Sequence, residues 1–429
     1  MNNRKHNYKA VAEFAPQESV LVSWPPDVES CRGQNVETVM TELIKALLPR
    51  VSVIVQCYYP SIKHAREVLS AAGADVSKVR FFRYESEDLL PEETSGLYVE
   101  TTYPRDYGAE IVMDGQGNRA VVDFDNAYYC TAGCDRYARE ATVIQSFGRW
   151  HAAIEGIDEI IFTRLISEGG AREFNGNGLM ICIQETEVDK RNPNLRRSEV
   201  EKEFKRLFNL EKVIMLPKCT FDDEDHFSGA IPGPDGKWNA FRSSSANGHV
   251  DEMCRFINED TVLLAEVTED AATINELDRI NKERLDAALK VLKESTTVDG
   301  KPLKVVRMPV AAPIYYEIDE GDLLHGIWME TKGEVGNTLP DGAPFPEGKM
   351  TVLPAMSYCN FLITNGAVIG QKFWSEGVSE EVRRTDEQAR EILQKCFPDR
   401  EIIQIYTIPL NLLGGGVHCG TRQIPKAVK

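Results

Sequence analysis

Apolar residues along this chain repeat in two alternating periods. Within residues 36–48 they recur every three or four positions (Val36, Met40, Leu43, Ile44 and Leu47), and a run rich in β-branched residues follows at 51–57. The first spacing predicts an amphipathic helix and the second a strand. The same order of helix and short strand returns four more times, at 141–154 with 159–162, 198–208 with 212–216, 272–292 with 303–308, and 379–396 with 401–406.

A candidate β-hairpin follows each of the first four strands. The hairpins span 107–124, 171–183, 250–267 and 358–373, and Gly or Asn stands at each turn, where a tight hairpin needs positive φ. The fifth strand is followed only by a glycine-rich run, 412–421. We therefore expect the first strand of the chain, 19–24, to supply the missing partner by pairing with the C-terminal end.

These units predict an α/β fold in which five similar blades form a propeller. Pairing of the two termini would close the ring and leave no open sheet edge. An ordinary open α/β sheet, which also alternates helices and strands, is the alternative. No linker separates two halves, so residues 1–429 are expected to form one domain. Two inserts, 219–247 and 317–350, are rich in Gly, Pro, Asp and Ser and are predicted to be surface or lid loops.

Charge and composition exclude several classes of protein. The net charge of −18 argues against general nucleic-acid binding, because an acidic surface repels phosphates. No apolar run approaches the ~18 residues that span a bilayer, and the polar start does not read as a signal peptide, so a cytoplasmic protein without membrane contact is expected. The ten Cys then predict reduced thiols. Cys130 and Cys134 are a poor zinc signal, and we expect no metal and no cofactor.

Each unit also places a polar residue near the start of its hairpin. If the units surround one axis, these residues converge there, and dissimilar ionisable groups brought together are typical of an active site rather than a core. The residues are Asp106, Glu168, His249 with Asp251, Asn360 and Cys419.

Cys419 is the best candidate nucleophile. Three glycines, 414–416, let the backbone approach closely, and His418 adjoins it. His249 and Asp251 have i, i+2 spacing, which on a strand puts both side chains on one face and suits an acid/base histidine with a carboxylate. A structural cysteine and a surface His–Asp pair are the alternatives for each feature taken alone.

Three acids would make such a pocket anionic. Together, Asp106, Glu168 and Asp251 suit a planar cation such as guanidinium, whose N–H donors match carboxylates in pairs. Each acid alone could equally form a local ion pair or cap a turn. Trp24, at the end of the first strand, is a candidate aromatic wall for the substrate or else a core residue.

The combination and order of these motifs resemble one known family. The chain is similar nearly end to end to the agmatine deiminase and bacterial-type peptidylarginine deiminase family of the guanidino-modifying pentein superfamily. The motifs are 12–18, 23–25, Arg-Asp-Tyr-Gly (105–108), Glu-Gly-Gly (168–170), Gly-His-Val-Asp (248–251) and Gly-Gly-Gly-Val-His-Cys-Gly-Thr (414–421). The resemblance implies a five-bladed α/β propeller. It also implies Cys419 as nucleophile, His249 as acid/base, Asp106 and Asp251 as guanidinium ligands, and Glu168 and Asn360 as further site residues.

The resulting hypothesis is a metal-free cysteine hydrolase that converts agmatine to N-carbamoylputrescine and ammonia, a reaction of putrescine biosynthesis, through a covalent thiouronium on Cys419. A peptidylarginine or free arginine deiminase, an amidinotransferase, and a non-catalytic arginine-binding protein are the alternatives. Agmatine is preferred because it carries two positive charges and no carboxylate. Free arginine would need a cationic clamp, for which Arg105, Arg172 and Arg422 are candidates. The expected partner is this small cationic guanidino substrate, and homo-oligomerisation is left open.

Overall fold

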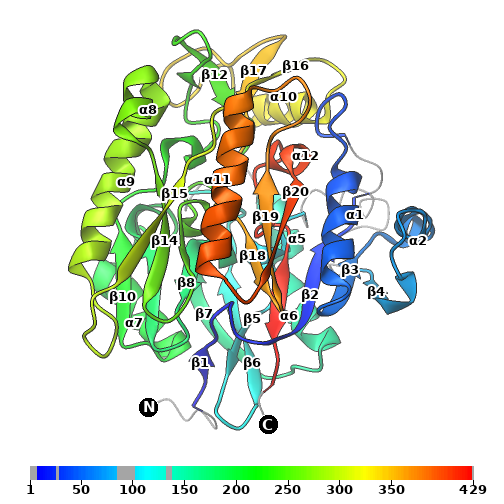
Figure 1. Cartoon of the computed structure of the whole chain (residues 1–429), viewed down its shortest axis with the longest axis vertical. Coiled ribbons are helices and arrows are strands. Elements are labelled where there is room, and N and C mark those ends of the chain that lie inside the picture. Colours follow the sequence, from blue (N-terminus) through cyan, green and yellow to red (C-terminus); the bar gives the residue numbers. More distant parts are fainter. Residues whose placement is uncertain (1–6, 26–28, 85–101, 132–137, 428–429) are drawn as a thin grey trace.

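Five of the six sheets in the described chain repeat one pattern. The computed structural model describes residues 7–25, 29–84, 102–131 and 138–427 (Figure 1). Each of the five sheets has two antiparallel strands and a third strand parallel to the middle one. In that order they are β21 (Arg422–Pro425), β2 (Gln17–Ser23) and β3 (Ser52–Gln56); β5 (Glu110–Met113), β6 (Arg119–Asp125) and β7 (Ile160–Ile166); β8 (Arg172–Phe174), β9 (Leu179–Ile183) and β10 (Lys212–Leu216); β13 (Cys254–Phe256), β14 (Thr261–Glu266) and β15 (Lys304–Pro309); and β18 (Leu362–Thr364), β19 (Ala367–Lys372) and β20 (Glu401–Tyr406). The four predicted hairpins are thus confirmed.

A helix leads into the third strand of each of these sheets. These helices are α1 (Val36–Leu47), α5 (Ala138–Ile144) with α6 (Phe147–Ile154), α7 (Arg197–Phe208), α8 (Glu269–Ile274) with α9 (Glu276–Glu294), and α11 (Glu380–Cys396). Two predicted helices are therefore each divided in two. The second division has a clear cause: Asn275 is extended, and its side chain accepts the N–H of Asp278 at 2.7 Å, which caps α9 and separates it from α8.

The two ends of the chain meet in one sheet, as predicted. Strand β21 pairs antiparallel with β2, with Val20 opposite Gln423 and Leu21 opposite Arg422. Two further strands extend the repeated sheets: β4 (Val79–Phe82), preceded by α2 (Ile62–Ala71), lies beside β3, and β1 (Lys9–Ala10) lies beside β5. Among the described residues the sheets stay separate and form no continuous closed sheet.

The two inserts are only partly loops, because they also contain short strands and a helix, which corrects the prediction. They pair with each other in a sixth sheet, ordered β11 (Ile231–Pro232), β12 (Trp238–Arg242), β17 (Met350–Leu353) and β16 (Tyr316–Ile318), with α10 (Leu323–Val335) beside it. Ala240 of β12 stands opposite Thr351 of β17. Under this sheet Phe227 packs edge-on against Trp328 with ring centroids 4.7 Å apart. Strands this short, paired over about 110 residues of sequence, leave no local periodicity for a sequence to show.

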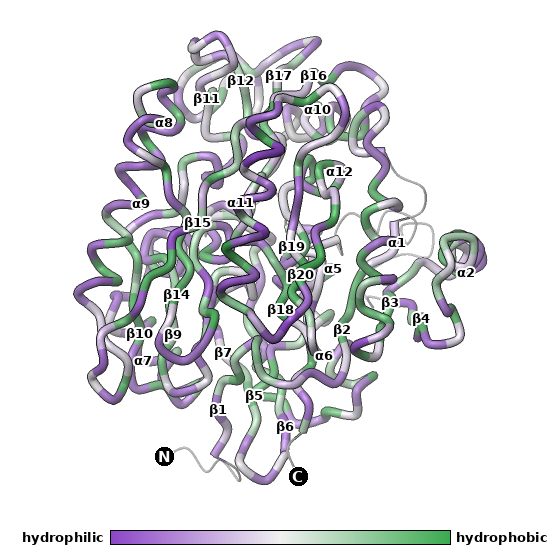
Figure 2. Tube along the Cα trace, in the orientation of Figure 1, coloured by the Kyte–Doolittle hydropathy of each residue, from purple (hydrophilic) through white to green (hydrophobic). Residues whose placement is uncertain are grey.

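The hydrophobic strands lie inside and the amphipathic helices outside. Figure 2 shows apolar stretches along strands β14 and β19 on the two sides of helix α11, whereas α9 and α11 alternate polar and apolar turns. All five residues of β9 are buried, as expected for a strand covered on both faces. None of the described helices is long and apolar enough to cross a membrane.

Candidate active site

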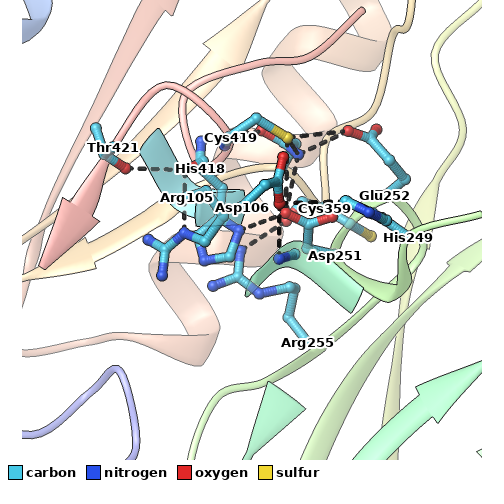
Figure 3. Close-up of polar contacts among 12 residues, drawn as sticks. Arg105, Asp106, His249, Asp251, Glu252, Arg255, Cys359, His418, Cys419 and Thr421 are labelled. Atoms are coloured by element: carbon cyan, nitrogen blue, oxygen red, sulfur yellow. Dashed lines mark hydrogen bonds and ion pairs between the residues drawn. The ribbon is translucent and has the colours of Figure 1, made fainter. Parts of the chain in front are cut away.

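Each of the five repeated sheets supplies a site residue from the segment just before its first strand. The structure brings together all of the ionisable residues predicted to converge. Asp106 lies on the single-turn helix α4 (Pro104–Tyr107), Glu168 just before the turn Gly169–Ala171, His249 and Asp251 at and within the turn Val250–Glu252, Asn360 before β18, and Cys419 before β21. Figure 3 shows Asp106, His249, Asp251, Glu252 and Cys419 pointing toward one another.

Asn360 fixes the loop that carries Cys419. Its side-chain oxygen accepts the backbone N–H of His418 at 2.9 Å and of Cys419 at 3.2 Å. Its amide nitrogen lies 2.9 Å from Sγ of Cys419. The glycine run is needed here, because Gly414 has φ of 109° and a Cβ on Gly416 would lie 2.3 Å from the side chain of Gln371. The loop therefore presents the sulfur at a fixed position.

The Cys419 thiol is buried beside carboxyl groups. Its Sγ lies 3.7 Å from Oδ2 of Asp251 and 3.7 Å from Oε1 of Glu252. Burial and these acids, with Asp106, raise the pKa of Cys419 well above its usual value. Burial, Asp251 and Asp223 also raise the pKa of Glu252 well above its usual value. The free protein thus holds a thiol, and a bound cation would shift it toward thiolate.

His249 lies between two carboxylates without a close hydrogen bond to either. Its Nδ1 is 3.4 Å from Oδ1 of Asp106 and its Nε2 is 3.5 Å from Oε2 of Glu168. Burial disfavours the charged ring, but the two anions outweigh it and raise the pKa of His249 to about 9. Its backbone N–H is held by Oδ2 of Asp223 at 2.8 Å. The ring is therefore a protonated acid near neutral pH whose two N–H groups can donate to new partners.

Glu168 is held by an arginine that no sequence motif marks. Nε of Arg191 lies 2.9 Å from both oxygens of Glu168. Burial opposes ionisation, yet Arg191 prevails and lowers the pKa of Glu168 to about 2. Arg191 is buried and also donates to the carbonyls of Cys130 and Ala246. It follows one turn of π-helix, Glu185–Lys190, in a stretch that carries no recognisable motif.

Asp106 is fixed by two donors. Its Oδ1 accepts the N–H of Gly170 and its Oδ2 the hydroxyl of Tyr129, both at 2.8 Å. Tyr129 has φ of 65°, a strained value for a bulky residue and a frequent mark of a functional loop. A Cβ on Gly170 would lie within 3 Å of His249, Asp106 and Asp251. The glycine of the Glu-Gly-Gly motif thus lets these side chains meet.

Asp251 is joined to a second buried histidine. Its Oδ2 lies 2.6 Å from Nδ1 of His418, while its Oδ1 is buried without a hydrogen-bond partner among the described residues. On the other side of that ring, Nε2 of His418 lies 2.6 Å from Oε2 of Glu13. Burial opposes the charge of Asp251, but His418 and then His249 outweigh it and lower its pKa.

A cavity of about 480 Å³ opens onto Cys419 and Asp106. The inserts form much of its described lining, through 225–226, 244–247 and several residues of α10 between 323 and 330. Four acids and one arginine are among the described lining residues: Asp106, Glu140, Asp225, Glu330 and Arg139. The approach to the thiol is therefore mainly anionic.

Two predicted substrate contacts lie elsewhere. Trp24 is 1% exposed and packs with Val20 and Val22 in the hydrophobic core, not on the described lining of the cavity, which corrects the aromatic-wall hypothesis. The candidate carboxylate clamp is also corrected, because its three arginines are buried and paired inside the protein. Arg105 pairs with Glu13, and Arg172 and Arg422 both pair with Glu110.

One group of side chains has the geometry of a metal site. The ligand atoms of Asp251, Glu252 and Cys419 lie within 4.8 Å of one another. Each of the three already contacts the amide nitrogen of Asn360, and burial raises the pKa of Glu252, which disfavours its anionic form. A zinc site would need anionic ligands and a fourth donor. The set therefore fits a thiol and its surroundings better than a metal.

Comparison with known proteins assigns the family. A model of the Porphyromonas-type peptidyl-arginine deiminase family matches residues 9–230 and 238–425. The chain belongs to this family. The agmatine deiminase of Pseudomonas aeruginosa strain LESB58 is 27% identical, with 98% of this chain and 96% of that protein aligned, and the agmatine deiminase of Pseudomonas fluorescens strain SBW25 is 28% identical with the same coverage.

A solved structure supports the same fold. The agmatine deiminase of Enterococcus faecalis superposes with a TM-score of 0.67 at 22% identity, covering 98% of this chain and 96% of that one. This family member therefore has the α/β pentein fold that the sequence predicts.

Proposed function

We propose that this chain hydrolyses the guanidinium group of agmatine and releases ammonia. The observation that carries the proposal is a buried cluster of a thiol that opens onto the cavity, a protonated imidazole flanked by carboxylates, and a carboxylate oxygen with no hydrogen-bond partner among the described residues. Cys419, His249 and Asp251 supply these three groups. The relatives named agmatine deiminase, aligned over nearly their full length, support the choice of substrate.

Binding comes first in the proposed mechanism. The guanidinium donates to Asp106 and to Oδ1 of Asp251, satisfying the buried oxygen. Its positive charge beside Sγ offsets the acids that raise the pKa of Cys419, so the thiol loses its proton to solvent. The substrate thus generates the nucleophile that attacks it.

Two covalent steps follow. The Cys419 thiolate forms a bond to the guanidinium carbon, His249 gives its proton to the departing nitrogen, and the C–N bond breaks to release ammonia and leave a thiouronium. The neutral imidazole then takes a proton from water as that water attacks the same carbon, and the C–S bond breaks as the new hydroxyl loses its remaining proton to solvent. The ureido product, N-carbamoylputrescine, and the thiolate remain.

The cavity supports an ammonium tail rather than a carboxylate. Glu140, Asp225 and Glu330 are also on the described lining, where Arg139 is the one arginine. Agmatine presents a second cation to these acids. Free arginine would present its carboxylate to them instead.

The arrangement around the cavity extends the proposal. Five sheets of one design, each contributing to the site, support five blades closed by β2 and β21, and a single domain over the whole chain. The small substrate supports the cytoplasm as the working compartment, and homo-oligomerisation stays open.

The test is ammonia release from a panel of agmatine, arginine, N-blocked arginine and C-blocked arginine. We expect the highest kcat/KM with agmatine. A higher value for arginine or a blocked arginine would overturn the substrate, and an absence of ammonia from all four would overturn deimination.

A further inference from the structure

The N-terminal motif 12–18 has no part in the chemistry proposed above, yet one of its side chains reaches the site. Glu13 lies between β1 and β2, and 9% of its side chain is exposed. Its Oε1 accepts from Arg255 at 2.9 Å and from the N–H of Ile363 at 2.8 Å. Its Oε2 lies 2.6 Å from Nε2 of His418 and 3.2 Å from a guanidinium nitrogen of Arg105. Both oxygens are therefore fixed.

His418 joins Glu13 to Asp251. Its two ring nitrogens contact one carboxylate each, both at 2.6 Å. A neutral imidazole has one donor and one acceptor, and an ionised carboxylate only accepts, so two such contacts require both nitrogens to carry protons. Burial opposes the charge of Glu13, but His418 and Arg255 outweigh it and hold its pKa well below the usual range. The three groups form an anion–cation–anion chain.

This chain of contacts determines which oxygen of Asp251 is available. Oδ2 is occupied by His418, and Oδ1 is buried with no hydrogen-bond partner among the described residues. Without His418, the carboxylate could rotate or turn toward Asn360, whose amide nitrogen already lies 3.4 Å from Oδ2. An unsatisfied buried oxygen is costly unless a ligand completes it.

We propose that Glu13 and His418 are positioning residues that hold Oδ2 of Asp251 and so present Oδ1 to the guanidinium. The inference rests on the proposed function. Neither residue touches the substrate; Glu13 acts through His418, and His418 acts through Asp251. The N-terminal segment thereby becomes part of the active site.

The test compares Glu13→Gln and His418→Gln with wild type and with the control Glu18→Gln. Glu18 is an exposed member of the same motif that pairs with Arg119 at the surface. For each protein, kcat and KM for agmatine are measured across pH 5–10, a range of about five units around neutrality, together with the melting temperature.

The pH profile separates positioning from a merely structural role. His418 is the strongest of the groups that lower the pKa of Asp251. Removal of His418 raises the pKa of Asp251. As the pH falls, Asp251 is therefore protonated sooner, and the acid limb of kcat/KM moves toward neutrality. The titratable groups facing Asp251 are Asp106, His249, Glu252, Arg255, Cys359, His418 and Cys419, of which the variant changes only one.

We expect kcat/KM to fall about 10- to 100-fold at pH 7 in both variants, as for a displaced catalytic contact, with KM rising more than kcat falls. The acid limb should shift upward in both, and Glu18→Gln should match wild type. An unchanged acid limb in folded variants overturns the proposal even if activity drops, and so does failure of both variants to fold. Inactivity of wild type on agmatine counts against the proposed function alone, and the comparison is then run on whichever guanidino compound is turned over.

Discussion

Two buried histidines of this protein each lie between two carboxylates, and they differ in how tightly they are held. His249 stands 3.4 and 3.5 Å from Asp106 and Glu168, with no close hydrogen bond from either ring nitrogen. His418 stands 2.6 Å from both Asp251 and Glu13. A ring with loose contacts can pass its proton to a reacting group, whereas a ring with two short charge-assisted bonds is fixed. Although their neighbours are similar, His249 is therefore suited to act as an acid and His418 to hold Asp251 in position.

The largest effect should come from removing the sulfur of Cys419, the proposed nucleophile. Cys419→Ala is expected to lower kcat by at least about four orders of magnitude, because it removes the sulfur that forms the covalent intermediate. The fold should be retained, since the new side chain is smaller. Ammonia release and a melting curve check this, with Cys396→Ala as the control. Near-normal turnover would sink the mechanism.

The second largest loss of activity should come from changing Asp251, the carboxylate that His418 holds. Asp251→Asn removes one charge from a buried guanidinium partner, a loss of about 3–5 kcal/mol, or two to four orders of magnitude in kcat/KM. Asp106→Asn should behave similarly. Steady-state kinetics decide the point: a variant with wild-type kcat/KM would show that its residue does not hold the guanidinium.

Separate substitutions of His249 and His418 test directly whether the two rings have different roles. His249→Asn should lower kcat about 10²- to 10⁴-fold, the usual loss for a general acid and base. His418→Asn should act mainly on KM. If both variants lost kcat to the same extent, the difference in contact distance would have no functional meaning.

A substitution of Glu168 tests the proposed acid role of His249 through the pH dependence of activity. His249 has its pKa raised to about 9, so its protonated form is present below that pH and is lost as the pH rises through it. We expect kcat/KM to fall along that alkaline limb. Glu168→Gln removes one of the anions that raise this pKa, so the fall should begin at lower pH. A pH–rate profile measures it, with Glu201→Gln on the surface of α7 as control. An unmoved limb would contradict the role given to Glu168.

The smallest expected effect is that of chelation. The proposed route uses a thiol, an imidazole and carboxylates, and Asn360 already contacts the three side chains that could bind a metal. Dialysis against EDTA should leave kcat unchanged. Loss of activity with recovery on adding zinc would favour a metal hydrolase instead.

Local pattern carried most of the fold. Hydrophobic periodicity located the helices and third strands of the five sheets, and glycine or asparagine turns located the hairpins, because these signals arise within about ten residues. Pairing of β2 with β21 was predicted by counting strands, from the absence of a partner in the fifth unit. The inserts were misread as loops, since their short strands are stabilised only by one another.

The site residues also differ in whether the local sequence marks them. Asp106, Glu168, His249, Asp251, Asn360 and Cys419 could be selected in advance, because each stands beside glycine or at a turn before a strand. Arg191 and Tyr129 could not, because nothing near them in sequence marks them. Glu252 directly follows the Gly-His-Val-Asp motif, but its own position carries no signal that separates it from a surface acid. Trp24 was misplaced because an aromatic residue at a strand end reads the same in a core and in a pocket.

Local sequence patterns specify which residue types recur in which order, and therefore the five units and the chemistry available to them. The distances between those residues follow only from the folded structure. The distinction between His249 and His418 depends on less than 1 Å in contacts that span up to 405 residues of sequence. Such contacts are set by the packing of separate sheets against one another, and packing leaves no trace in local periodicity.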